Sequence, residues 1–339
     1  MDPLTHALAS YSLKRAAFPR VSRIVTLAIL AAGTIADLDS LGSYFGPSGY
    51  LTFYRTFFHS LIAALLFSLL VTLPFFFLKG KTAENQISHA RIFAAALAAA
   101  ILHLLLDLCQ SAGVELLWPF SSRRFALDWV AHLDLWILAI LLVGILLPLL
   151  SGLVTEEIGA KSKGPRGRTG ASVALGALFF YLILRFMYHG NALAAMESRT
   201  YHGEPARRVA AFGESSSPLR WHGIIETDRA LLDVNVEVGP FASFDPDAAM
   251  TSYKPEPSPA LDAARNSAIG RRFLQVARFP KATVEQTPGG FHVILRDFPY
   301  SRDTGSGLGV QAIVDTDPSG TLLSEELVRA SSSHDFWWK

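Results

Sequence analysis

The first 190 residues alternate long apolar runs with short polar connections. A helix that crosses a bilayer needs ~20 mostly apolar residues, and three of the runs reach that length. A fourth run is a weaker candidate, because Arg185 near its end has to reach the interface with its long side chain. The pattern predicts about six helices, the first two of them short: residues 3–18, 21–36, 60–78, 91–108, 130–150 and 171–188.

From about Asn191 the pattern changes, and charges, prolines and glycines are spread throughout. Residues 232–238 alternate between apolar and polar side chains, which is typical of a half-buried strand. Turn sequences at 287–290 and 317–320 separate further short apolar stretches, as hairpin turns do. The predicted strands lie within 221–238, 291–295, 309–314 and 321–323, and a helix is predicted at 260–277. We therefore expect an all-α transmembrane bundle at residues 1–190 and a soluble α+β domain at residues 191–339.

Composition agrees with a membrane protein. Half of the 339 residues are apolar, 17% are charged, and the mean hydropathy is +0.31, which is too hydrophobic for an ordinary cytosolic domain. The net charge of +1 gives no broad basic surface, so nucleic acid is not expected as a partner. Cys109 is the single cysteine, which excludes an intrachain disulfide and a thiolate metal cluster. Any metal must be held by imidazole and carboxylate groups.

Basic residues in the short connections predict the orientation of the helices. Lys and Arg gather in alternate connections, and such connections face the cytoplasm. These residues are Lys14, Arg15, Arg20, Arg23, Lys79, Lys81, Arg91, Lys161, Lys163, Arg166 and Arg168. The opposite connections carry Arg55, Arg123 and Arg124. We therefore expect a multi-pass protein of a bacterial inner membrane, with both termini and the soluble domain on the extracytoplasmic side.

His and Asp residues collect at one end of the predicted helices. Under this orientation all of them lie at the extracytoplasmic boundary, although they come from five different helices. His103 and Asp107 are four residues apart, so they lie on one face of their helix. The candidate metal ligands are His6, Asp37, Asp39, His59, His103, Asp107, Asp128 and Asp134.

Packing and helix capping are the alternative interpretations of these residues. A single His such as His103 on an apolar helix is usually a hydrogen-bonded packing residue, and Asp39 and Asp128 could be helix caps. Ionisable groups within membrane helices are nevertheless costly and indicate functional sites. Caps are expected at both faces of a membrane and ligands at one, so the joint pattern favours a site.

The donor types indicate the metal and the chemistry. Imidazole and carboxylate groups suit Zn²⁺, with Mn²⁺ or Fe²⁺ as alternatives. The candidates exceed the four donors of one tetrahedral ion, so we expect about two or three ions. Such sites activate water and hold the oxygens of a phosphoester during its displacement. Arg55 and Arg124 are candidate substrate-binding residues, because a guanidinium matches a phosphate; for Arg124, anchoring to anionic headgroups is the alternative.

Several motifs resemble the YdjM-type family of bacterial inner-membrane metal-dependent hydrolases. They are Met-Asp-Pro-Leu-Thr-His at 1–6, Ala-Asp-Leu-Asp at 36–39, Arg-Thr-Phe-Phe-His-Ser at 55–60, His-Leu-Leu-Leu-Asp-Leu at 103–108 and the stretch 113–129. The resemblance covers roughly residues 1–150. It implies similarity to zinc-dependent phospholipase C and P1-type nucleases, which also take metal ligands from helices. The family pattern has Pro where Ala36 stands, which is not a ligand position, and His132 replaces an apolar residue.

The predicted function is that of a membrane-bound metal-dependent hydrolase. We expect a phosphoesterase that acts on a lipid or another substrate at headgroup depth, with Asp37 or Asp39 accepting the proton of a bound water. Two alternatives remain open. A metal or ion transporter would place donors near mid-membrane, with a route to both faces. A non-catalytic membrane scaffold with a partner-binding soluble domain would need no donor cluster.

Overall fold

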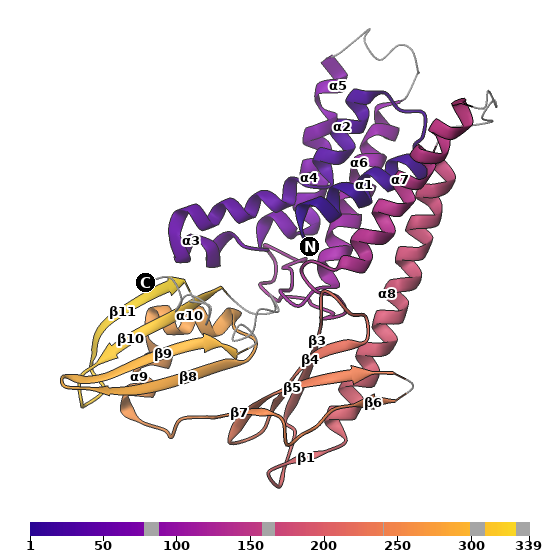
Figure 1. Cartoon of the computed structure of the whole chain (residues 1–339). Coiled ribbons are helices and arrows are strands. Elements are labelled where there is room, and N and C mark those ends of the chain that lie inside the picture. Colours follow the sequence, from indigo (N-terminus) through magenta and orange to yellow (C-terminus); the bar gives the residue numbers. More distant parts are fainter. Residues whose placement is uncertain (78–87, 158–166, 240, 299–308, 330–339) are drawn as a thin grey trace. The chain divides into compact units, whose positions relative to one another are not determined.

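The computed structural model describes residues 1–77, 88–157, 167–239, 241–298 and 309–329. Two compact units divide the chain, and each has its own core (Figure 1). The first unit contains Met1–Ser40 and Phe53–Phe186, and the second contains Leu41–Thr52 and Met187–Lys339. The helical segment thus contributes a short internal stretch to the second unit.

Helices make up the N-terminal region. They are α1 (Pro3–Ala17), α2 (Arg23–Ala32), the 3-10 helix η1 (Ile35–Phe45), α3 (Gly46–Phe53), the 3-10 turn η2 (Phe57–His59), α4 (Leu61–Thr72), α5 (Pro74–Phe77), α6 (His89–Leu108), α7 (Leu135–Glu157) and α8 (Arg168–Glu197). Four of the α-helices begin after a residue whose side chain accepts a hydrogen bond from the first turn. Asp2, Ser22, Ser60 and Ser88 play this part before α1, α2, α4 and α6.

Two helices, α6 and α8, are long and apolar enough to cross a membrane. A third span results if α2 and the segment Ile35–Phe53, which are bent by 50° at a short break, count as one. The run at 60–78 is interrupted before Pro74, whose ring cannot continue the helical hydrogen bonds. The run at 130–150 forms a helix only from Leu135. The N-terminal region is therefore helical with two candidate spans, and the other crossings of the six-helix bundle stay predictions.

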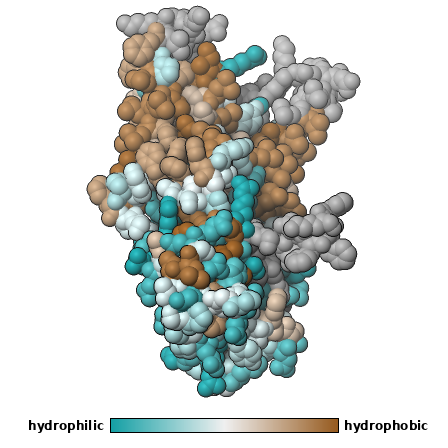
Figure 2. Space-filling view, turned by 90° about the vertical axis from the view of Figure 1, so that its left-hand side faces the viewer, coloured by the Kyte–Doolittle hydropathy of each residue, from teal (hydrophilic) through white to brown (hydrophobic). Residues whose placement is uncertain are grey.

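Packing in the first unit centres on α6. Its buried face carries small residues, Ala95, Ala96, Ala99 and Ala100, which let α1, α2 and α4 approach closely. Large apolar side chains cover the outer surface of the first unit, as Figure 2 shows in brown. The exposed residues include Leu65, Leu69, Val173 and Phe180. Such a surface suits hydrocarbon rather than water. The basic residues Lys79, Lys81, Lys161, Lys163 and Arg166 lie outside the described residues.

The second unit is rich in sheet, and its surface is mostly hydrophilic (Figure 2). Its strands are β1 (Thr200–Tyr201), β2 (Glu204–Pro205), β3 (Arg208–Gly213), β4 (Arg220–Glu226), β5 (Ala230–Val238), β6 (Ala242–Ser243), β7 (Met250–Tyr253), β8 (Pro280–Thr287), β9 (Gly290–Asp297), β10 (Val310–Thr316) and β11 (Leu322–Arg329). All pairings are antiparallel. The first sheet has the order β3-β4-β5-β6, with β7 also beside β5, and the second is the meander β8-β9-β10-β11; β1 and β2 form a small two-stranded sheet.

The strand predictions are confirmed, and the predicted helix at 260–277 is two helices. The 221–238 segment is the β4–β5 hairpin, and the turns near 288 and 318 join β8 to β9 and β10 to β11. Helices α9 (Pro259–Asn266) and α10 (Ala268–Val276) are separated at Ser267, whose hydroxyl accepts a hydrogen bond from Gly270 N at 2.9 Å. This cap starts a new helix.

Each of the two larger sheets of the second unit has a separate apolar core. Trp221 is fully buried on the first sheet, where Ala192 and Met196 from the end of α8 pack against the strands. Phe273 of α10 and Leu51 of α3 pack with the second sheet. Leu51 explains why the segment Leu41–Thr52 belongs to this unit.

Candidate metal centre

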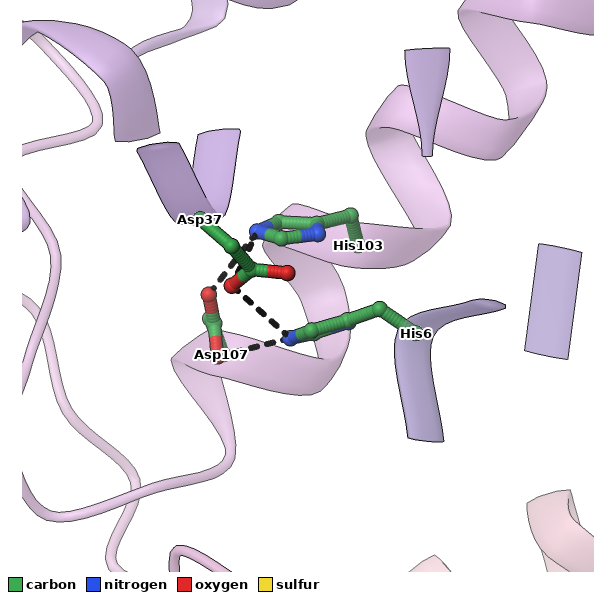
Figure 3. A group of neighbouring side chains, drawn as sticks. All are labelled: His6, Asp37, His103 and Asp107. Carbon is green, nitrogen blue, oxygen red and sulfur yellow. Dashed lines mark ion pairs between the residues drawn. The ribbon is translucent and has the colours of Figure 1, made fainter. Parts of the chain in front are cut away.

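Four side chains of the first unit meet in a group that could hold a metal ion. His6, Asp37, His103 and Asp107 each place one donor atom within 4.8 Å of the others. They come from α1, η1 and α6, and Figure 3 shows them pointing toward one another. His6 Nε2 lies 3.3 Å from Asp107 Oδ1 and 4.0 Å from Asp37 Oδ1. His103 Nε2 lies 3.1 Å from Asp107 Oδ2 and 3.9 Å from Asp37 Oδ1.

The backbone at the end of α2 sets the orientation of His103. Gly33 caps α2, and its carbonyl oxygen accepts a hydrogen bond from His103 Nδ1 at 2.9 Å. Because a carbonyl can only accept, Nδ1 carries the proton and Nε2 presents its lone pair to the group. The chain then turns into η1, where Asp37 N donates to Thr34 O. The short stretch from Gly33 to Asp37 thus orients His103 and places Asp37 in the group.

His59 and Asp39 form an adjoining pair. His59 Nε2 lies 2.8 Å from Asp107 Oδ2, and its Nδ1 lies 3.0 Å from Asp39 Oδ2. The same Asp39 oxygen accepts a hydrogen bond from Arg55 N at 2.6 Å. Asp39 therefore sits behind His59, in the position of a carboxylate that orients an imidazole. His59 touches the group directly.

Arg55 brings a buried cation to the same place. Only 3% of its surface is exposed, and its φ of 58° is unusual for a residue other than glycine. Its Nη2 donates to Asp107 Oδ1 and to Gln110 Oε1, both at 3.2 Å. Its Cζ also lies 5.4 Å from the centroid of the Tyr54 ring.

The sequence analysis did not single out Gln110. This residue is almost fully buried, and its Nε2 donates to Asp107 Oδ1 at 2.6 Å. Its Oε1 also accepts from His132 Nδ1 at 3.2 Å, so His132 joins the network one residue away from Asp107. The amino group of Met1 contacts Asp107 as well. Position alone could have suggested Gln110, because it follows Asp107 by three residues, just beyond the end of α6 at Leu108.

Three of the predicted site residues make other contacts. Asp134 accepts hydrogen bonds from Trp136 N and Ile137 N at the start of α7 and from the Tyr181 hydroxyl at 3.0 Å. Arg124 lies 3.3 Å from Glu115 and donates to Tyr54 O at 2.9 Å. Asp128 is buried with a φ of 62° and is not a member of the four-residue group.

The chemistry of the group fits a divalent cation. Two imidazoles and two carboxylates are a donor set that Zn²⁺ accepts. Among the described residues, Asp37 Oδ2 makes no hydrogen bond, and His6 Nε2 faces the two carboxylates at 3.3 and 4.0 Å. Buried polar atoms without good partners are costly, and a cation held between His6 Nε2 and the carboxylates would satisfy these atoms. The residues present therefore fit a metal site, with His6, Asp37, His103 and Asp107 as its donors.

Comparison with known proteins gives one match. The model of the YdjM inner membrane protein family matches residues 1–192, which include every residue of the group described above. No curated protein and no solved structure matches the chain.

Proposed function

The chain belongs to the YdjM inner membrane protein family, and we propose that it is a membrane-bound metal-dependent hydrolase that cleaves a phosphoester at the extracytoplasmic face. The observation that carries the proposal is the buried guanidinium of Arg55 against the His and Asp group. It lies 3.2 Å from Asp107, and only 3% of the residue is exposed. A fixed cation beside metal ligands is suited to bind a phosphoryl oxygen.

The proposed metal is zinc, with manganese or iron as alternatives. His6, Asp37, His103 and Asp107 supply four donors, and His59 with Asp39 would supply further ones. Because these exceed the needs of one tetrahedral ion, we propose about two or three ions. When bound, the metal would lower the pKa of a water molecule and polarise the phosphoryl group. The further similarity to zinc-dependent phospholipase C and P1-type nucleases is supported by the helical origin of the donors, including the His103 and Asp107 pair.

Four side chains near the proposed metal have separate proposed roles in proton transfer, ligand orientation and substrate binding. Asp37 is the proposed proton acceptor, because 16% of its side chain is exposed and its Oδ2 makes no hydrogen bond among the described residues. Asp39 was an equal candidate from sequence, but its contacts with His59 and Arg55 N suit it better to hold the imidazole. Arg55 would bind the anion. Arg124 is proposed at the rim of the site, where its bond to Tyr54 O also supports the backbone beside Arg55.

The position of the donors favours a hydrolase over a transporter. His103 and Asp107 lie in the last two turns of α6, which ends at Leu108. A transport site would be expected near the middle of its helices, with access from both faces. A substrate at headgroup depth is therefore the better match, and a phospholipid or isoprenoid phosphate is the proposed class.

Two substitutions test the proposal with purified protein in detergent. The parent should retain a transition metal and cleave a phosphoester from a panel of phospholipid, isoprenoid phosphate and nucleotide substrates. Asp37→Asn removes the proton acceptor and keeps one coordinating oxygen, so turnover should fall by ~10² or more with the metal content largely kept. Arg55→Lys keeps the charge but loses the planar fork, so KM should rise.

Arg123→Lys is the matched control, because Arg123 is exposed and lies outside the group. It should behave like the parent in every assay. A parent that binds no metal would exclude the metal-dependent reaction. A metal-loaded parent that cleaves no phosphoester, with both variants unchanged, would leave the scaffold as the better hypothesis.

A further inference from the structure

An elongated apolar groove of 760 Å³ runs along α6 and α8 in the first unit. Its walls include Ile101 and Leu105 of α6 and Phe179 and Ile183 of α8. Cys109 and Trp129 are the lining residues that carry any polar side-chain atom. A polar ligand would find almost no hydrogen-bond partners there, so the groove selects for hydrocarbon.

The length of the groove matches one leaflet of a bilayer. Lining residues on α8 run from Leu175 to Phe186, and those on α6 run from Ala98 to Cys109. Eleven residues of helix rise about 16 Å, which is about half of the ~30 Å hydrocarbon core. Because both helices are candidate membrane spans, the groove lies along the direction that a lipid chain takes.

One end of the groove lies at the level of the metal centre. Trp129 lines this end, where its backbone N–H donates to Cys109 O at 2.8 Å and its ring lies 5.2 Å from that of Phe186. Leu106 and Leu108 line the groove and flank Asp107 on the same helix. A chain in the groove therefore ends beside the last turn of α6, where the His and Asp group is found.

We infer that the groove binds the hydrocarbon chain of a lipid phosphoester and brings its headgroup to the metal centre. The chemical part of this inference rests on the proposed function, and the binding part rests on the groove alone. The inference thereby adds a binding site for the hydrocarbon chain to the lipid phosphoester proposed above. Nucleotides and short soluble esters would lack the part that the groove recognises.

Lipid cross-linking tests the binding directly. The full chain is placed in vesicles of phosphatidylethanolamine and phosphatidylglycerol, with a phosphatidylglycerol that carries a diazirine in its acyl chain. After irradiation, mass spectrometry should find Phe179 and Ile183 labelled several-fold above Val173 and Phe180, which are exposed on the same helix but do not line the groove. Equal labelling of the two faces would overturn the inference.

A tryptophan that fills the groove provides the second arm. Leu105 is 53% exposed, so Leu105→Trp adds volume in the groove with little effect on the core. Labelling at Phe179 and Ile183 should fall in this variant and persist in the control Phe180→Trp. Each methylene kept from burial weakens binding roughly fourfold. The KM for a long-chain phosphoester should therefore rise by roughly 15- to 60-fold if two or three methylenes are displaced, whereas a short-chain ester should be unaffected.

The outcomes separate the two proposals. Strong groove labelling without any phosphoester cleavage would remove the proposed function and leave a lipid-binding groove. Cleavage of long and short esters with equal KM, together with equal labelling of both faces, would remove the groove and keep the hydrolase. Spontaneous disulfide-linked dimers of Leu105→Cys would show that a second copy covers the groove, which also overturns the inference.

Discussion

Gly33 is the residue at which the backbone of α2 touches both α1 and α6. A Cβ atom at this position would lie 2.0 Å from Ser10 Oγ and 3.4 Å from Ala99 Cβ. Its φ of −82° is open to any residue, so glycine is needed here for space rather than for backbone conformation. The carbonyl of Gly33 also holds His103 in the tautomer that presents Nε2. The close approach of the helices and the orientation of His103 therefore both depend on the absence of a side chain at Gly33.

Gly33→Ala is predicted to weaken metal binding. The methyl group must push the end of α2 away from Ser10, which displaces the carbonyl that orients His103. Loss of such a supporting contact typically costs ~10–100-fold in metal affinity. A competition assay with a chelating dye measures this change.

The chain offers both a control and a rescue for this prediction. Gly176→Ala should leave the affinity unchanged, because nothing lies within 4 Å of a Cβ placed there. Adding Ser10→Gly to Gly33→Ala removes the clashing hydroxymethyl group and should restore part of the affinity, relative to Ser10→Gly alone. Equal affinity in the parent and in Gly33→Ala would mean that the carbonyl contact is not needed.

Individual site residues differ in how far sequence could place them. The helical spacing of His103 and Asp107 predicts that they share a face, and the structure brings both into the four-residue group. Asp134 has the same residue type, but its oxygens contact Tyr181, which comes from a helix far along the chain. Spacing carries no information about such a partner. Gln110 was missed because an amide side chain is not a typical metal ligand and acts here through Asp107.

At the scale of elements, the apolar runs do not show where a helix breaks or begins. The run at 60–78 is broken before Pro74. Helix α7 begins at Leu135, and Asp134 just before it accepts hydrogen bonds from the backbone of its first turn. The longest helix, α8, was the weakest span by sequence because Arg185 lies within it. In the structure Arg185 is fully buried and donates to Trp129 O at 2.7 Å. Hydropathy counts the charge and cannot see this partner.

Small residues set the contact between α7 and α8. A Cβ at Gly144 would lie 2.3 Å from Ala174 Cβ and 3.0 Å from Gly170 O. The two helices are therefore packed backbone to backbone at this point, as is common between membrane helices. Gly176 lies on α8 as well, but a Cβ there meets nothing within 4 Å.

Gly144→Leu is predicted to destabilise the first unit, whereas Gly176→Leu is predicted to have little effect. Overpacking at a tight contact typically costs ~1–3 kcal/mol, and both variants add the same side chain to an apolar helix. Thermal unfolding in detergent should show a lower midpoint for Gly144→Leu alone. If both variants melt with the parent, α7 and α8 do not pack through Gly144.

At the scale of the whole molecule, the segment Leu41–Thr52 links the metal centre to the second unit along the chain. It follows Asp39 and precedes Arg55, yet Leu51 is buried in the core formed by α9, α10 and the second sheet. Sequence could not assign it, because its aromatic residues form neither a long apolar run nor an alternating strand. The site residues on either side of it are consequently tied to a segment that folds with the C-terminal unit.

The orientation of the chain in the membrane is a prediction that depends on α8. Its 30 residues rise about 45 Å, more than the ~30 Å hydrocarbon core. Its last turns, with Ala192 and Met196, are buried against the first sheet. If α8 spans the membrane, the connection before Arg168 and the C-terminal unit lie on opposite faces. The basic residues Lys161, Lys163 and Arg166 then place that connection in the cytoplasm and the C-terminal unit outside.

Cysteine labelling tests this arrangement on spheroplasts of cells that express the full chain. Cys109 is replaced by Ala, and single cysteines are introduced as Ser162→Cys and Glu256→Cys; Glu256 is exposed on the second unit. An impermeant thiol reagent should label Glu256→Cys on intact spheroplasts and Ser162→Cys only after permeabilisation. Labelling of both before permeabilisation would mean that α8 does not span the membrane. The reverse pattern would keep α8 as a span but turn the metal centre toward the cytoplasm, where the substrate would have to be a lipid of the inner leaflet.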